Sequence, residues 1–412
     1  MGLLGSWWKV RYIPTDRRKD SHATQDSNRL PNMLFHTPQL GDPERAVIDR
    51  IDEVREALRY QLTAQRSWVG LLRRVMLARA IRGSNSIEGY NVSLDDAVAA
   101  IAGEEPVDAA AEAWMAVSAY RDAMMYVVQL ADDPHFEYTR ALVRSLHYMM
   151  LRYDLDKSPG RWRPGPVYVL DERKQEIVYT GPDAMAVPAL MGEFTVELRT
   201  PGDVPAMVRA AMAHLNLAMV HPFRDGNGRM ARCIQTLVLA REGIVAPPFW
   251  SIEEYLGVNT DAYYQVLADV GQGEWHPERD ARPWVRFVLT AHYIQAQTLV
   301  RRAQEAERRW DAVSHEVSRR GLPERAATGV FNAAMGFRLR NATYREAAGV
   351  SDSVAGRDLK ALADAGLLQA VGERRGRFYV ASQAVLALEQ SIRQPRLPIE
   401  DPFVRLPATL GL

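Results

Sequence analysis

A base, a carboxylate and two guanidinium groups stand close together in the segment HPFRDGNGRMAR, residues 221–232. The imidazole of His221 has an ordinary pKa near neutrality and can act as a general base. Asp225 offers the hard oxygen ligand that Mg²⁺ prefers together with substrate phosphates. Arg229 and Arg232 share one face of a helix and can both bind phosphate oxygens. The segment therefore predicts a phosphoryl- or nucleotidyl-transfer site.

The glycines of this segment predict how the chain presents those groups. The preceding helix must end near His221, because the residue before a proline is disfavoured in the α conformation. Gly226 and Gly228 allow backbone conformations closed to other residues. A second helix is expected to begin at Gly228 or Arg229, and the free N–H groups of its first turn, around Asn227, form an anion site. For any one of these residues alone, a plain helix–helix connection is the alternative.

The segment is similar to the motif HPFx[D/E]GNGRxxR of the Fic family and matches it at every specified position. The resemblance covers roughly residues 80–290, including GRWR at 160–163 and YTGP at 179–182. It implies a protein adenylyltransferase, which moves AMP from ATP to a Ser, Thr or Tyr hydroxyl of a target protein. His221 would deprotonate that hydroxyl, and Asp225 would hold Mg²⁺ between the α- and β-phosphates.

The resemblance also implies which residues bind the nucleotide and the target. The implied nucleotide-binding residues are Gly226, Asn227, Gly228, Arg229, Arg232, Asn259 and Tyr263. For Asn259 and Tyr263, with the adjacent Tyr264, packing of an amphipathic helix is the alternative. Val178, Tyr179 and Thr180 would align the target by strand pairing, unless their hairpin only covers the core.

The segment SNSIEG, residues 84–89, is similar to the inhibitory motif [S/T]xxxE[G/N] of the same family. Ser84, Glu88 and Gly89 occupy its specified positions, and Tyr90 follows where the family often has a small or polar residue. The resemblance implies that Glu88 pairs with Arg232 and takes the place of the γ-phosphate. A carboxylate can stand in for a phosphate oxygen toward a guanidinium. The alternative is local, with the segment capping a helix that stops at Gly89.

The apolar pattern predicts a mainly α protein. Apolar residues recur at helical spacing over 43–82, where Gly83 is expected to end the helix, and over most of 108–305. β-Branched and aromatic runs flank a polar turn within 160–182, which predicts a β-hairpin. We expect a Fic-type helical core with a small β-hairpin flap, followed by a winged helix-turn-helix domain. The expected parts are an N-terminal arm and helical segment at 1–105, irregular over 1–40, a core at 106–305, a linker helix at 306–321, the winged helix-turn-helix at 322–392 and a tail at 393–412.

The region 322–382 resembles a DNA-binding module, and two functions stay open for it. In the DNA-binding hypothesis, a helix at 353–365 presents Ser353, Arg357 and Lys360 to the major groove, and the wing residues Arg374, Arg375 and Arg377 reach phosphates. Residues 321–392 contain nine basic and seven acidic residues, without the basic excess of a DNA reader. Protein docking, including formation of a homodimer, is the other hypothesis.

Composition narrows the possible partners, the cellular location and the class of function. Lys+Arg and Asp+Glu both number 51, so net charge indicates neither nucleic acid nor an anionic membrane as partner. The single cysteine, Cys233, excludes an intrachain disulfide and fits a reducing compartment. No apolar run approaches the about 18 residues of a spanning helix, and the N-terminus lacks the features of a secretory signal; we expect no membrane partner and a cytoplasmic protein. Two alternative functions remain, a Fic enzyme that removes AMP or transfers another phosphate group, and a nucleotide-sensing DNA-binding regulator.

Overall fold

The computed structural model describes residues 8–12, 33–63, 67–172, 174–200, 202–244, 251–373 and 377–404. The helices are α1 (Asp42–Thr63), α2 (Ser67–Ile87), α3 (Leu94–Ile101), α4 (Ala111–Ala131), α5 (Arg140–Leu151), η1 (Leu155–Lys157), α6 (Val187–Arg199), α7 (Ala206–Val220), α8 (Asn227–Arg241), α9 (Glu253–Val258), α10 (Thr260–Gly271), α11 (Arg282–Arg319), η3 (Glu324–Ala326), α12 (Ala327–Ala334), α13 (Asn341–Ala348), α14 (Asp352–Asp364) and α15 (Gln383–Ile392). The strands are β1 (Trp8–Tyr12), β2 (Val167–Asp171), β3 (Glu176–Thr180), β4 (Gly273–Glu274), β5 (Leu368–Val371) and β6 (Phe378–Ala381). The predicted mainly α class is confirmed.

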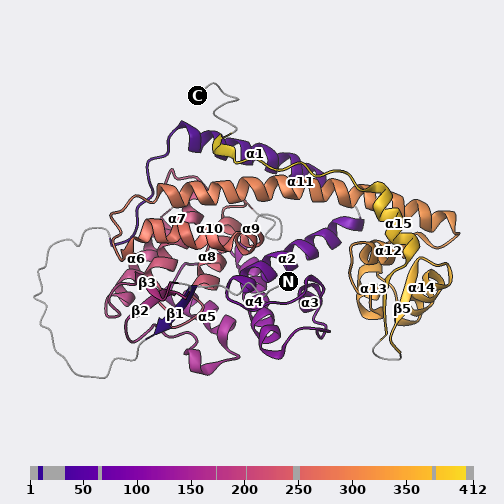
Figure 1. Cartoon of the computed structure of the whole chain (residues 1–412), viewed down its shortest axis with the longest axis horizontal. Helices are drawn as coiled ribbons and strands as arrows, with labels where there is room; N and C mark the ends of the chain where they lie inside the picture. Colours follow the sequence, from indigo (N-terminus) through magenta and orange to yellow (C-terminus); the bar gives the residue numbers. More distant parts are fainter. Residues whose placement is uncertain are drawn as a thin grey trace, which may run out of the picture.

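Helices α7 and α8 form the centre of the larger part of the molecule (Figure 1). Nearly all of their side chains are buried, including Leu215 and Leu217 of α7 and Ile234 and Leu237 of α8. Burial of each such side chain contributes about 1.5–3 kcal/mol to stability. The loop that joins the two helices, residues 221–226, is therefore held at both ends by the best-packed elements of the fold.

Helix α11 runs along the whole length of the molecule in Figure 1 and connects its two parts. Its first half contributes Val285 and Val288 to the main core, while Val313 and Val317 belong to a second core shared with α12 and α14. The predicted boundary between 305 and 306 thus falls inside one continuous helix. None of the described helices combines the length and the apolar character that crossing a membrane requires.

A small sheet lies at one edge of the helical part, with the strand order β1-β2-β3-β4. The predicted hairpin is confirmed, because β2 and β3 pair antiparallel. The expectation of an irregular segment over 1–40 is wrong at β1, which pairs antiparallel with β2 from Trp8↔Asp171 to Tyr12↔Val167. Residues 8–12 form a strand because they pair with a strand that is distant in the sequence, and the local sequence does not carry that information.

Helix α2 continues to Ile87, so the prediction that Gly83 ends it is wrong. The glycine serves a close crossing of two helices. A Cβ at Gly83 would lie 2.5 Å from the carbonyl oxygen of Glu253, and one at Gly257 would lie 2.8 Å from the Cα of Gly83. The backbones of α2 and α9 therefore touch, and only glycine fits at this contact. The helix ends instead at Ile87, and Gly89, two residues later, has a φ of +88° in the left-handed region.

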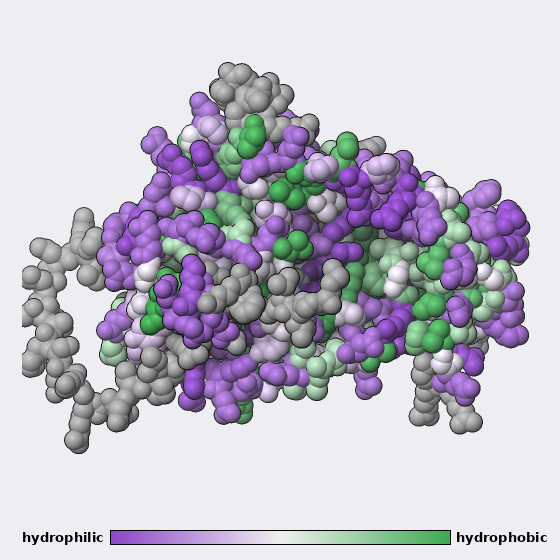
Figure 2. Space-filling model, in the orientation of Figure 1, coloured by the Kyte–Doolittle hydropathy of each residue, from purple (hydrophilic) through white to green (hydrophobic). Residues whose placement is uncertain are grey.

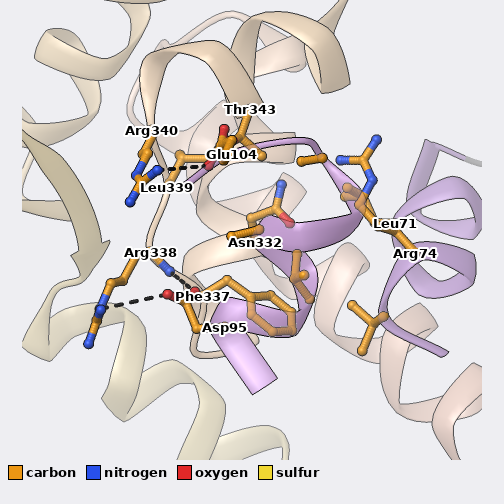
Figure 3. Close-up of a pocket in the computed structure, with 14 residues that line it drawn as sticks. Leu71, Arg74, Asp95, Glu104, Asn332, Phe337, Arg338, Leu339, Arg340 and Thr343 are labelled. Carbon is orange, nitrogen blue, oxygen red and sulfur yellow. Dashed lines mark hydrogen bonds and ion pairs between the residues drawn. The ribbon is translucent and has the colours of Figure 1, made fainter. Parts of the chain in front are cut away.

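The C-terminal part contains η3, α12, α13, α14, the β5–β6 hairpin and α15, and it contacts α3 and the loop that follows α3. The backbone N–H of Arg338 donates to Asp95 at 2.8 Å, and the Arg340 guanidinium lies 3.4 Å from Glu104 (Figure 3). Thr343 also donates to Glu104. Helix α3 follows closely after the segment Ser84–Gly89, so the C-terminal part rests on the element next to that segment.

Candidate active site

The loop between α7 and α8 turns sharply at His221. This residue caps α7 in the left-handed conformation, with a φ of 51°, and its N–H donates to the carbonyl of Leu217 at 3.0 Å. The side-chain amide of Asn227 bonds both the N–H and the carbonyl of Phe223 at 2.9 Å. Gly226 has a φ of +77° and precedes α8, which begins at Asn227, one residue before the predicted start. The loop is therefore fixed from both ends.

The ring of His221 has one bonded and one free nitrogen. Its Nδ1 lies 3.1 Å from the carbonyl oxygen of Ala218, so Nδ1 carries the proton and donates it. Its Nε2 is buried and has no hydrogen-bond partner among the described residues. Burial lowers the pKa of His221 to about 4, so the ring is neutral and the Nε2 lone pair is available at physiological pH. Such a nitrogen is equipped to take a proton.

The buried guanidinium of Arg163 holds the base in place. Its Nε donates to the carbonyl of His221 at 2.8 Å, and Nη2 donates to the carbonyl of Pro182 at 2.5 Å. Nη1 donates to Gly165 at 2.7 Å. One side chain thus ties the loop after α7 to both ends of the β2–β3 hairpin.

Asp225 lies beside the base with a half-buried carboxylate. Its Oδ1 accepts the N–H of Gly226 at 2.6 Å, and its Oδ2 lies 3.2 Å from the ammonium of Lys157. Burial acts to raise the pKa of Asp225, but the positive charges of Arg229 and Lys157 outweigh it and hold the pKa below its usual value. The carbonyl of Asp225 accepts a bond from His147 at 2.8 Å. The carboxylate is ionised and already paired with one cation, the ammonium of Lys157.

Arg229 and Arg232 are fully buried, which is rare for arginine without a charged partner. Within the described residues, Nε and Nη2 of Arg229 and Nη1 of Arg232 have no hydrogen-bond partner. These donors lie in the first two turns of α8, next to the helix start whose free N–H groups attract anions. Buried donors without partners are costly, at about 1–3 kcal/mol each. They fit a polyphosphate that would satisfy them.

Glu88 reaches the second of these arginines. Its Oε1 accepts a bond from Nη2 of Arg232 at 2.7 Å, while Ser84 accepts from Nε through its hydroxyl at 2.7 Å and from Nη2 through its carbonyl at 3.0 Å. A Cβ at Gly228 would collide with Oε1 of Glu88 and lie 3.1 Å from Nη1 of Arg232. The end of α2 is therefore packed directly against the first turn of α8, with Gly89 closing the helix behind Glu88.

The other predicted nucleotide residues lie deeper. The Tyr263 hydroxyl is buried 2.9 Å from Nε2 of His214, and its ring lies 5.2 Å from that of Tyr264. His214 in turn bonds Gln235 of α8 at 2.6 Å. The amide of Asn259 donates to the carbonyl of Tyr255 at 2.8 Å and so caps α9. The structure places Tyr263 next to Arg232 and keeps Asn259 occupied with its own helix end.

The predicted flap residues belong to β3, and part of their edge is covered. Tyr179 and Thr180 pair in parallel with Gly273 and Glu274 of β4. The Tyr179 hydroxyl is buried and donates to the carbonyl of Met219 at 2.8 Å, while Val178 is half-buried. The opposite edge of the hairpin is paired with β1. An incoming strand would meet a sheet that already has neighbours on both sides.

The predicted DNA-contact residues lie far from this site, in the C-terminal part. Ser353, Arg357 and Lys360 are all exposed along α14, and Arg377 is exposed directly before β6. Arg374 and Arg375 lie outside the described residues.

Sequence reasoning missed several side chains of the site. His147, Lys157 and Arg163 each bond the loop 221–226 or its flanks, yet each stands far from it in the sequence. Tyr153 of the segment after α5 accepts a weak bond of 3.4 Å from Arg229. The segment GRWR was noted, but nothing in it showed what Arg163 would bind. Only an approximate three-dimensional fold could have shown that these residues lie near the loop 221–226.

Fold and site together define a helical domain in which a buried neutral imidazole stands beside a strongly basic anion cradle. Comparison with known proteins names the domain: residues 137–239 match the model of the Fic/DOC family, and they form a Fic/DOC family domain. The likeness extends beyond those residues. A Nematostella vectensis protein named protein adenylyltransferase Fic is 26% identical over 271 residues, which is 64% of this chain and 58% of that protein. Protein adenylyltransferase fic-1 of Caenorhabditis elegans is 35% identical over 131 residues, 31% of this chain and 20% of that protein.

The chain therefore spans little more than half of the first of these relatives and a fifth of the second. Among solved structures, a Fic family protein from Desulfovibrio desulfuricans G20 superposes with a TM-score of 0.53 at 20% identity, over 87% of this chain and 99% of that one. A Fic domain protein from Bacteroides thetaiotaomicron gives a TM-score of 0.51 at 20% identity, over 64% and 97%. These two likenesses establish the fold.

Proposed function

We propose that the protein transfers AMP from ATP to a Ser, Thr or Tyr hydroxyl of a target protein and that Glu88 holds it inactive. The observation that carries the proposal is the buried Arg232, bound by the Glu88 carboxylate at 2.7 Å, together with a neutral His221 whose Nε2 has no hydrogen-bond partner in the described part of the chain. The relatives named protein adenylyltransferase support the same reaction.

The reaction needs one base and one anion cradle. Nε2 of His221 takes the proton of the target hydroxyl, and the oxygen attacks the α-phosphorus of ATP. The bond from that phosphorus to the bridging oxygen of the β-phosphate breaks, and pyrophosphate leaves with both electrons of the bond. AMP stays on the target through a new P–O bond. Arg229, Arg232 and the backbone around Gly226 and Gly228 bind the polyphosphate and stabilise the charge that builds up on it.

A magnesium ion fits the residues present. Asp225 supplies a single ionised carboxylate, and the described residues contain no cluster of three His, Cys, Asp or Glu that could hold a metal without help. Mg²⁺ is commonly bound by one or two carboxylates together with substrate phosphates. Once bound it would neutralise phosphate charge. We therefore assign Asp225 as its protein ligand, with the phosphates of ATP as the others.

Inhibition follows from the contact at the end of α2. While Glu88 holds Arg232, the guanidinium cannot bind the end of the polyphosphate, and a carboxylate at that place repels the γ-phosphate. Ser84 and Gly89 fix Glu88 by bonding Arg232 and by closing the helix, respectively. The activating event must therefore displace the segment 84–89 or its side chains.

The target is proposed to pair with the β2–β3 hairpin near Val178, Tyr179 and Thr180. Because β1 and β4 cover its two edges, the target must displace a strand or extend the sheet beyond the two residues of β4. Strand addition supplies main-chain bonds and leaves specificity to side-chain pockets. We place the reaction in the cytoplasm, in keeping with a single buried free cysteine, Cys233.

For the C-terminal part we propose a winged-helix module that docks a protein, a second copy of this chain included. On the face shown in Figure 2, hydrophobic surface gathers over this part, which includes the exposed Val371 and Leu386. Exposed apolar patches mark sites of protein–protein or membrane contact and ligand-binding grooves, whereas DNA-binding surfaces are strongly basic. The DNA alternative relies on the exposed Ser353, Arg357 and Lys360 of α14.

Gel shift on random duplex DNA over a range of salt separates the two hypotheses. Protein docking predicts no shift, whereas a shift whose affinity falls steeply with salt would establish DNA binding. Light scattering reports the oligomeric state in the same samples.

The activity itself is tested with Glu88→Gly protein, ATP, Mg²⁺ and a host lysate, followed by mass mapping of the modified residue. The proposal expects AMP on a hydroxyl side chain. Release of AMP from an already modified protein would favour the reverse reaction, and absence of both would end the proposal.

A further inference from the structure

Lys157 occupies an unusual position for a lysine at the surface of a small helix. Its Nζ lies 3.2 Å from Oδ2 of Asp225, 3.6 Å from Asp154 and 2.7 Å from the hydroxyl of Tyr90. The ring centroids of Tyr90 and Tyr153 lie 5.4 Å and 5.7 Å from the same nitrogen. Two carboxylates, the phenol hydroxyl of Tyr90 and the ring of Tyr153 hold this ammonium in one place.

Tyr90 belongs to the segment that carries Glu88. The left-handed Gly89 turns the chain back at the end of α2, and the N–H of Tyr90 donates to the carbonyl of Asn85 at 3.0 Å. This turn brings the half-buried Tyr90 ring to the start of α8, where the guanidinium of Arg229 lies 5.2 Å from its centroid. One short segment therefore contacts Arg232 through a carboxylate and Lys157 through a phenol.

The ammonium of Lys157 occupies a position next to Asp225, where it would compete with a metal ion for the carboxylate. The carboxylate of Asp225 is the group assigned above to Mg²⁺, and its Oδ2 is already bound by Lys157. Two cations close to one carboxylate repel each other strongly in a half-buried site. Lysine is a flexible point charge, so it can leave when its other partners leave.

We propose that Lys157 is an internal cation that replaces the metal ion at Asp225, and that Tyr90 holds it there while Glu88 blocks Arg232. This inference rests on the proposed function and deepens it. The segment Glu88–Tyr90 then closes two parts of the site at once, the phosphate end and the metal end. Withdrawal of the segment removes the phenol from Lys157 and opens Asp225 together with Arg232.

The test measures ATP binding by calorimetry with and without Mg²⁺, in full-length protein carrying His221→Ala so that ATP is not consumed. Lys157→Met keeps the length of the side chain and removes its charge. Tyr90→Phe keeps the ring against Arg229 and removes only the hydroxyl, so it also serves if the lysine variant folds poorly. Lys174→Met, at the exposed turn of the β2–β3 hairpin, is the matched control.

We expect Lys157→Met to tighten the Kd for ATP in saturating Mg²⁺ by about tenfold and to increase the ratio between the Kd without and with Mg²⁺. Tyr90→Phe should act in the same direction with a smaller change, and Lys174→Met should change neither value. Weaker ATP binding by Lys157→Met in Mg²⁺ would make Lys157 a phosphate ligand and overturn the inference. An unchanged ratio in both variants would reduce the Lys157–Asp225 pair to a structural contact.

The result also separates this inference from the proposed function. ATP binding in all proteins with an unchanged Mg²⁺ ratio overturns the inference alone. No ATP binding in any protein, even after Glu88→Gly is added, overturns both.

Discussion

Glu88 and Arg232 are 144 positions apart in the sequence and joined by a hydrogen bond of 2.7 Å. The Arg232 side chain is 1% exposed and that of Glu88 is 19% exposed, so the ion pair is largely shielded from water. In such a setting, removal of one partner leaves the other charge in need of a new one. Under the proposed function, the phosphates of ATP would supply that new partner.

Replacing Glu88 with glycine should therefore raise AMP transfer, by about tenfold or more. Arg232 loses its internal carboxylate and becomes free to bind the polyphosphate. The measurement is the initial rate of label transfer from ATP into protein at fixed enzyme concentration. Glu105→Gly, which removes an exposed glutamate in the loop after α3, is the matched control. Equal rates for Glu88→Gly and the unaltered protein would show that Glu88 does not inhibit transfer.

Replacing His221 with alanine in the Glu88→Gly protein should abolish transfer while ATP binding persists, because Nε2 acts on the target hydroxyl and not on the nucleotide. The pKa of His221, lowered to about 4 by burial, adds a pH signature. The base stays neutral down to about that pKa, so the rate should not fall between pH 8 and pH 6 through its protonation. A rate that halves near pH 6.5 would contradict this assignment.

The free energy of unfolding should decrease as the pH is lowered, because the buried histidines are then forced to ionise. Burial lowers the pKa of His147 and His221 to about 4 and of His214 and His292 to about 3. A histidine whose folded pKa lies below its unfolded value of about 6.5 stabilises the fold above pH 6.5. That contribution is lost as pH falls toward the folded pKa, by about 2 kcal/mol for each at pH 5.

Urea unfolding at pH 7.5, 6.0 and 5.0 measures this loss. His214→Gln, which keeps a polar group near Gln235 and Tyr263, should flatten the decline between pH 6.5 and 5. A free energy of unfolding that does not change over this range would show that these rings are not buried as described.

Gly83→Ala should destabilise the protein by about 1–3 kcal/mol. The added methyl group would lie 2.5 Å from the Glu253 carbonyl oxygen and 2.9 Å from the Cα of Glu254, so α2 and α9 must separate. Gly70→Ala is the control in the same helix, since a Cβ there meets nothing within 4 Å. It should be neutral or stabilising by up to about 1 kcal/mol. Thermal unfolding compares them, and similar Tm values would argue against the close crossing.

The sequence predicted those features of the fold that are determined by local residue patterns. The loop between two helices at His221 follows from the His-Pro pair and the glycines, and the hairpin follows from its β-branched runs. Gly83 was misread because a glycine in a helical run looks the same whether it ends the helix or admits a neighbour. That neighbour, α9, is far away in the sequence, and so is the partner of β1.

The residues of the candidate site form the same two groups, those predictable from local sequence and those that depend on long-range contacts. Residues inside the segment 221–232 could be named from their types and spacing. Lys157, Arg163 and His147 could not, because they act through long-range contacts with backbone or with Asp225. A buried arginine that bonds four carbonyl groups, as Arg163 does, carries no sequence signature of its own.

The most direct test of AMP transfer uses Glu88→Gly protein and two samples of ATP, one labelled at the α-phosphate and one at the γ-phosphate. The account predicts that protein acquires the α-label only, and that His221→Ala in the same background abolishes the incorporation. Incorporation of the γ-label would show phosphoryl transfer instead. Absence of both labels, or incorporation of the α-label that persists without His221, would contradict AMP transfer by this site.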